Sequence, residues 1–99
     1  MYCILWNYEV DSGNAAAFEQ ECGRNGSWFK FYESCDDYLG HDLLKNTSGG
    51  SYTIIERWIT KDAYDSFLGG NKGGYDELKG KIAGLQKSET QVGTFDLIQ

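Results

Sequence analysis

The stretch YLGHDLL, residues 38–44, contains His41, the only histidine of the 99-residue chain. An unperturbed imidazole titrates near neutrality, at about pH 6.5, so it takes up and releases protons under physiological conditions. His41 is therefore a candidate general base, with Asp42 or Glu56 as its partner in a non-oxidative acid–base reaction. The alternative is an ordinary strand residue, at a dimer face or partly exposed, that is hydrogen-bonded to a neighbour.

Trp58 and Tyr64 are the other candidate catalytic residues, at a predicted junction between a strand and a helix. Trp58 ends the strand and Tyr64 starts the helix, so we expect the two rings to meet and to anchor the junction. The phenol of Tyr64 could also donate a hydrogen bond to a substrate oxygen.

Glu56 and Arg57 precede Trp58 and alternate in direction, so one faces the helices and the other the opposite side. A buried charge needs a partner, and we expect Arg57 to pair with Glu9 or Asp42 across the strands. The alternative role for Arg57 is to anchor a carboxylate or a phenolate of a ligand.

Large aromatic rings are unusually frequent, since the chain has 3 Trp, 7 Tyr and 5 Phe. A domain of this size does not need so many rings to close its core, so a planar, apolar ligand stacked among them is a credible interpretation. The candidate ligand-pocket residues are Trp6, Tyr8, Trp28, Phe31, Tyr32 and Phe67.

The net charge of −6 excludes some classes of partner. Nucleic acids and anionic membrane surfaces attract clustered Lys and Arg, and the 9 basic residues are spread along the chain. We therefore expect no nucleic acid and no membrane as partner. A small apolar or aromatic molecule and another protein chain remain.

Cys3, Cys22 and Cys35 are odd in number and lack CxxC spacing. The chain also lacks the apolar segment of a signal peptide and any run long enough to span a membrane. These features predict a cytoplasmic protein with free thiols and neither a disulfide framework nor a metal site. We expect no cofactor.

Hydrophobic periodicity and turn residues predict one α+β domain over residues 1–99. The order is βαββαβ with both helical blocks split, as in ferredoxin-like folds with a four-stranded antiparallel sheet and helices on one face. Thr60 is the predicted cap of one helix. The predicted strands are 3–10, 38–46, 51–59 and 94–98, and the predicted helical segments are 14–22, 27–35, 60–68 and 75–87.

The predicted strands carry bulky residues on both faces, although helices can cover only one. An uncovered apolar sheet face needs a partner, so we expect a homodimer that packs sheet on sheet. Regular alternation along 38–44 places His41 on the same face as Leu39 and Leu43.

The segments YEVDSG, YLGHDLL and SYTIIERWITKDAYDSFL resemble the antibiotic biosynthesis monooxygenase (ABM) family of dimeric α/β barrels. The W-x-T-x-x-A-Y junction carries much of this resemblance, which extends over nearly the whole chain. It implies a ligand site between the sheet and the helices. Members of the superfamily oxidise phenols or quinols with O₂ and no cofactor, degrade haem, or isomerise and dehydrate small molecules.

The resemblance also implies roles for individual residues. Trp58 and Tyr64 match the Trp and the aromatic residue implicated in the cofactor-independent, quinone-forming members. Ile54 stands where those enzymes carry an Asn, and Leu78 and Lys79 stand where they place an Arg. The haem-degrading members use a His, a Trp and an Asn, and this chain has Glu77, Phe67 and Trp6 at those positions, so we do not expect haem degradation.

Two functions follow as hypotheses. The first is a dimeric protein that binds a small aromatic or polyketide-like molecule and oxidises it as a cofactor-independent monooxygenase. The second is a non-catalytic small-molecule-binding or dimerisation module with the same fold.

Overall fold

A four-stranded antiparallel sheet forms one layer of the computed structural model, which describes residues 1–99. The strand order β2-β3-β1-β4 puts the N-terminal strand in the interior of the sheet. This is the predicted ferredoxin-like arrangement. The strands are β1 (Tyr2–Glu9), β2 (Tyr38–Lys45), β3 (Ser51–Trp58) and β4 (Ser88–Asp96).

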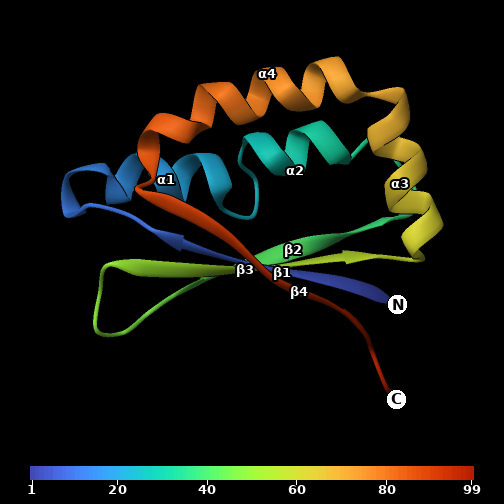
Figure 1. Ribbon diagram of the computed structural model, residues 1–99, viewed down its shortest axis with the longest axis horizontal. Coiled ribbons are helices and arrows are strands. Elements are labelled where there is room, and N and C mark those ends of the chain that lie inside the picture. The colour runs from blue at the N-terminus through green and yellow to red at the C-terminus, as the bar shows by residue number, and fades with distance from the viewer.

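All helices lie on one side of the sheet, as Figure 1 shows. Both helical blocks are divided in two, as the sequence predicts. None of the helices combines the length and the apolar composition that a membrane span requires. The helices are α1 (Ala15–Cys22), α2 (Ser27–Tyr32), α3 (Lys61–Gly70) and α4 (Lys72–Ile82), with short 3₁₀ segments at Ser12–Asn14 and Ala83–Leu85.

Local side-chain chemistry explains where α3 begins. The Thr60 hydroxyl oxygen accepts a hydrogen bond from the Ala63 backbone N–H at 3.1 Å, and Asp62 lies in the first turn. Both features stabilise the N-terminus of a helix, and the predicted Thr60 cap is confirmed. The N-cap residue of α2 is Gly26, which has no side chain to cap the helix, and the hydroxyl of Ser27 donates a hydrogen bond to the carboxylate of Glu21.

The last strand is longer than predicted. β4 begins at Ser88, whereas the sequence pattern predicts a strand only from residue 94. Its first half is polar and lacks an apolar alternation, because β4 is an edge strand that pairs on one side only, with β1. Backbone hydrogen bonds to β1 hold this half in place, and they leave no periodic signal in the side chains.

A β-bulge in β2 corrects one prediction about His41. Tyr38 pairs with Trp58 and Gly40 with Arg57, so Leu39 is an extra residue on β2. The prediction that His41 shares a face with Leu39 is therefore wrong. Tyr38 and His41 are buried towards the helices, while Leu39 is 44% exposed. Gly40 adopts φ +96°, a left-handed conformation that side chains with a Cβ disfavour.

Gly40→Ala is expected to destabilise the protein by about 1–2 kcal/mol, because alanine is strained at this positive φ. Urea unfolding measures the change. The matched control is Gly80→Ala in the interior of α4, where an added Cβ meets no atom within 4 Å. That substitution should stabilise by about 0.5–1 kcal/mol. Equal stability of Gly40→Ala and the native chain would contradict a bulge held by Gly40.

The core consists of two clusters between the sheet and the helices. One surrounds Phe18 of α1, and the other surrounds Trp58 at the end of β3, both residues being fully buried. The rings of Trp58 and Tyr64 lie 5.3 Å apart in a T-shaped arrangement, which confirms the predicted contact at the junction. Trp6 and Trp28 pack against both clusters and therefore occupy the space between them.

The opposite face of the sheet is not covered by helices (Figure 1). The Arg57 guanidinium lies there and pairs with Asp42 of β2 at 2.8 Å, as predicted. Leu44 of β2 and Phe95 of β4 are each 49% exposed.

Candidate functional site

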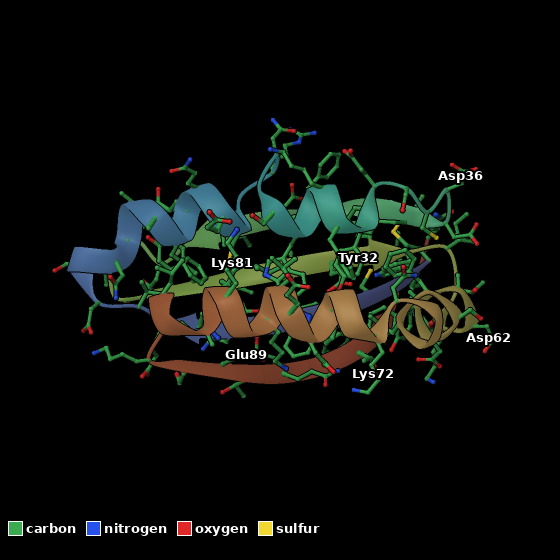
Figure 2. All side chains as sticks on the ribbon, turned by 90° about the horizontal axis from the view of Figure 1, so that it is seen from above. Tyr32, Asp36, Asp62, Lys72, Lys81 and Glu89 are labelled. Atoms are coloured by element: carbon green, nitrogen blue, oxygen red, sulfur yellow. The ribbon has the colours of Figure 1, made fainter.

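A cavity lies between the sheet and the helices α2 and α4. It has an empty volume of about 390 Å³, part of which is open to solvent. In Figure 2, Tyr32 is labelled between α2 and α4, and Glu89, a residue of β4, is labelled between α4 and β4. We call this space between the sheet and the helices the aromatic cavity. Its lining residues are Trp6, Tyr8, Trp28, Tyr32, His41, Ile54, Glu56, Tyr75 and Glu89.

Five rings and two carboxyl groups dominate this lining. The rings come from three elements that are far apart in the sequence, namely β1, α2 and α4. Trp28 stacks on Tyr32 with centroids 6.0 Å apart and contacts Tyr75 at 5.5 Å. Packed rings of this kind present flat apolar surfaces, which suit a planar ligand.

Glu56 is the buried charged group of the cavity, with 6% of its surface exposed. Its two carboxyl oxygens accept hydrogen bonds from two indole N–H groups, Trp6 Nε1 at 3.2 Å and Trp58 Nε1 at 2.7 Å. No Lys or Arg contacts Glu56 among the ion pairs of the structure. Burial raises the pKa of Glu56 to about 7, although the indole hydrogen bonds to Trp58 and Trp6 oppose the rise.

The sheet positions this carboxyl. Alternate residues of β3, from Tyr52 to Trp58, face the helices and are buried, so Glu56 and Trp58 are neighbours on one face. Glu56 pairs with Ile4 of β1, and Trp6 is therefore its diagonal neighbour across the strands. A carboxyl placed here would be costly without hydrogen bonds, and the two indoles supply them.

The stability of the fold should depend on the protonation of Glu56. Its pKa is about 7 in the folded chain against 4.5 for the free side chain, so the folded state binds this proton more tightly. The stabilisation of the folded state by the protonated carboxyl of Glu56 is fully present below pH 4.5, and it is lost as the pH rises through about 7. The loss amounts to about 3 kcal/mol.

Urea unfolding at a series of pH values measures this effect. Between about pH 5 and pH 8 the free energy of unfolding of the native chain should fall. In the Glu56→Gln variant the free energy of unfolding should depend much less on pH over the same interval, because glutamine does not titrate. Parallel curves for the two proteins would contradict a raised pKa at Glu56.

His41 borders the cavity with both ring nitrogens engaged. Nε2 lies 2.9 Å from the carbonyl oxygen of Cys22, and Nδ1 lies 2.5 Å from the Tyr38 hydroxyl. A carbonyl only accepts, so Nε2 carries the hydrogen, and Nδ1 accepts from Tyr38. His41 thereby ties β2 to the end of α1, and it must release one of these partners before it can exchange a proton with a ligand.

Trp58 and Tyr64 do not line the cavity. Trp58 is completely buried among other rings, and its indole N–H reaches the cavity only through Glu56. Burial raises the pKa of Tyr64 well above its usual value. Both residues therefore contribute to the packing under α3, and Trp58 also holds the carboxyl of Glu56.

Of the predicted ligand-pocket residues, four lie in the lining and two do not. Phe31 and Phe67 pack against Tyr32, at 5.2 and 5.5 Å between ring centroids, and form part of the core behind the cavity. The four residues in the lining are Trp6, Tyr8, Trp28 and Tyr32.

Sequence reasoning did not assign Ile54, Tyr75 or Glu89 to the lining, and it undervalued Glu56. The alternation of β3 could have marked Glu56 as an inward carboxyl next to Trp58. Tyr75 is the first residue of the helical segment predicted over 75–87, and it shares the helical spacing of Leu78 and Ile82, which is a pattern typical of core residues. Glu89 lies in the half of β4 that left no signal, and it pairs with Lys79 at 3.2 Å. The structure contains no group of three or more His, Cys, Asp or Glu side chains placed to hold a metal ion.

Comparison with known proteins agrees with this architecture. The model of the family described as antibiotic biosynthesis monooxygenase matches residues 1–72. The crystal structure of a mutant of SnoaB, a cofactor-independent oxygenase from Streptomyces nogalater, aligns with a TM-score of 0.81 and 20% identity, over 99% of this chain and 93% of that one.

Two further structures show the same fold. They belong to proteins from Deinococcus radiodurans and Nitrosomonas europaea that have been assigned to antibiotic biosynthesis monooxygenases. The first has a TM-score of 0.77 and 15% identity, over 100% of this chain and 94% of that one. The second has a TM-score of 0.75 and 13% identity, and the alignment covers 100% of both chains. A search of curated proteins found no matching sequence.

Proposed function

This chain belongs to the antibiotic biosynthesis monooxygenase family, and from that membership we propose that it binds a small hydroxyaromatic molecule in the aromatic cavity and oxidises it with O₂. Neither a metal nor a flavin takes part in the proposed reaction. One observation carries the proposal: the buried carboxyl of Glu56 faces a cavity whose other walls are mainly aromatic rings.

The walls support a flat, apolar ligand of the polyketide type. Rings from β1, α2 and α4 surround the space, and their faces and edges would stack on a fused aromatic system. Ligand sites are commonly apolar with a few placed polar groups, and here Glu56 is the more deeply buried of the two carboxyl groups.

In the proposed reaction Glu56 in its ionised form accepts the proton of a ring hydroxyl. The resulting phenolate is electron-rich and transfers electrons to O₂, so no cofactor is needed for this step. For a phenol with an unsubstituted para carbon, one O₂ is consumed, one oxygen atom enters the ring as the second quinone oxygen, and the other leaves as water. The similarity in fold to SnoaB, a cofactor-independent oxygenase, supports this reaction class.

The test is incubation of the purified protein with α-naphthol and with a panel of hydroquinones, in air and under nitrogen. We expect O₂ uptake in air, one quinone formed per O₂ from α-naphthol, and one labelled oxygen atom in that quinone when labelled O₂ is supplied. An absence of O₂ uptake above the protein-free rate across the panel would rule out the oxygenase.

A second candidate function is a binding module without catalysis. Trp58 lies behind Glu56, and Tyr64 lies outside the cavity. The resemblance to the quinone-forming members also implies an Asn at the position of Ile54, which cannot form the hydrogen bonds of that side chain. A thermal-shift screen distinguishes the two functions, because a ligand at a hundred times its Kd stabilises by about 2.7 kcal/mol whether or not it reacts. Stabilisation by hydroxyaromatics without O₂ uptake would favour the binding module.

We also propose that two copies of the chain associate through the face of the sheet that lacks helices. Leu44 and Phe95 are half exposed there, and each would be buried by a second sheet. Arg57 and Asp42 on this face are already paired with each other, so a second sheet need not supply partners for these two charges. Light scattering should give twice the chain mass of 11.1 kDa, and a monomer at micromolar concentration would contradict the proposal.

A further inference from the structure

We propose that the aromatic cavity selects its ligand by charge: it accepts neutral and cationic hydroxyaromatics and rejects those that carry a carboxylate. This inference rests on the proposed function, because it names the class of molecule that the same cavity takes. It follows from the charges and hydrogen-bond donors that surround the space.

The charged groups of the lining are acidic. Glu56 and Glu89 are the two carboxyl residues, and the lining contains neither Lys nor Arg. Lys79 is the cation nearest in the fold to Glu89, and the two form an ion pair at 3.2 Å. An incoming carboxylate would therefore compete with Glu89 for Lys79 and would meet the field of Glu56 without a counter-charge.

The chain has an arginine that could in principle anchor a carboxylate, but the sheet directs it elsewhere. Arg57 follows Glu56 in β3, so its side chain points to the other face. There its guanidinium binds Asp42 at 2.8 Å. The alternation of side chains along β3 thus places the carboxyl of Glu56 in the cavity and the positive charge of Arg57 on the opposite face of the sheet.

Three of the nitrogen donors around the cavity are already engaged in hydrogen bonds. The indole N–H groups of Trp6 and Trp58 donate to Glu56, and the Nε2–H of His41 donates to the Cys22 carbonyl. The other side-chain donors of the lining are neutral, and they serve a neutral oxygen of a ligand as well as a charged one. They are the indole N–H of Trp28 and the hydroxyls of Tyr8, Tyr32 and Tyr75. They do not offset the cost of burying an unpaired anion.

A neutral hydroxyl fits the same surroundings. A carboxylate offers about four lone-pair positions, and the indoles occupy two of those of Glu56. A ligand hydroxyl can donate a hydrogen bond to one of the remaining lone pairs of Glu56. A positive charge elsewhere on the ligand would be attracted to the two carboxylates and to the faces of the surrounding rings.

The experiment compares three probes that share a phenol and differ in one terminal group: tyramine, tyrosol and para-hydroxyphenylacetate. They are cationic, neutral and anionic near neutral pH. Binding is followed through tryptophan fluorescence, because Trp6 and Trp28 line the cavity. At about pH 8, where Glu56 is largely ionised, we expect para-hydroxyphenylacetate to bind at least about tenfold more weakly than tyrosol, and tyramine at least as tightly as tyrosol.

Two variants test the cause of this ranking. Glu56→Gln and Glu89→Gln each remove one negative charge of the lining, and each should narrow the gap between the anionic and the neutral probe. The matched control is Glu77→Gln, which changes an exposed residue on α4. This variant should leave the difference in affinity between the anionic and the neutral probe unchanged.

Three results would overturn the inference. They are a carboxylate probe that binds as tightly as tyrosol, a tyramine affinity reduced as much as that of the carboxylate, and no binding of any probe up to millimolar concentration. The second result would show that either charge is penalised alike, by desolvation. O₂ uptake with α-naphthol is measured separately, so oxygenation without the charge ranking would refute only the selectivity, and the ranking without oxygenation would refute only the reaction.

Discussion

Glu56→Gln is expected to lower kcat for α-naphthol by about a hundredfold to ten-thousandfold, the usual contribution of a positioned general base. The amide has almost the shape of the carboxyl and fills the same space. Its oxygen can still accept a hydrogen bond from the Trp58 indole, which lies at 2.7 Å from Glu56. It cannot accept the proton of a ring hydroxyl, so the loss should appear in kcat while tyrosol binding stays within a few fold.

The pH profile provides a second readout of the same residue. Burial raises the pKa of Glu56 to about 7, and only the ionised form accepts a proton. The rate for the native chain should therefore rise with pH and reach half of its maximum near pH 7. In Glu56→Gln this inflection should disappear, and Glu56→Asp should retain an inflection at reduced rate.

The control for this experiment is Glu77→Gln, which changes an exposed carboxylate on α4 and should leave both the rate and the profile unchanged. A Glu56→Gln variant that turns over α-naphthol within a few fold of the native rate would show that another group takes the proton. His41 would then be the next candidate, since it also borders the cavity.

Trp58→Ala is expected to have the largest effect on stability, a loss of about 3–5 kcal/mol. Trp58 is the largest fully buried side chain and contacts the rings of Tyr32, Tyr38 and Tyr64 at 5.2–5.3 Å between centroids. The substitution also removes the shorter hydrogen bond to Glu56. Domains of this size are commonly stable by only about 5–15 kcal/mol, so urea unfolding should show a strong shift of the midpoint.

Trp58→Phe separates the two roles of this residue. Phenylalanine keeps much of the ring packing but has no N–H to donate to Glu56. The indole N–H stabilises the ionised form of the Glu56 carboxyl more than the protonated form. The loss of this N–H should therefore raise the pKa of Glu56 further. The cost of Trp58→Phe should therefore be larger at about pH 8 than at about pH 5. An equal cost at both pH values would show that the hydrogen bond to Glu56 contributes little.

Short-range patterns in the sequence were sufficient for most of the architecture. The alternation of apolar residues predicted β1, β2 and β3, and Thr60 marked the start of α3 through its hydrogen bond to Ala63. The contact of Trp58 with Tyr64 followed from their places at one strand–helix junction. These features depend on residues within a few positions of one another, so the local sequence carries them.

Features that depend on a distant strand were predicted less well. The bulge at Leu39 and Gly40 changed the side of the sheet to which Leu39 belongs, because one extra residue reverses the alternation. The first half of β4 is held by backbone pairing with β1, which no side-chain pattern records. Glu89 entered the lining of the cavity through that pairing.

By itself, the sequence determined the order of the elements, the βαββαβ topology, the opposite directions of Glu56 and Arg57 on β3, and the abundance of rings available for a cavity. Only the tertiary structure decided which of those rings line it and which merely support it. It also decided that both nitrogens of His41 are engaged, and that Glu56 stands between two indoles without a cation. The physical reason is that burial, and with it the pKa of a carboxyl, is set by side chains from β1, β3 and the helices that meet only after folding.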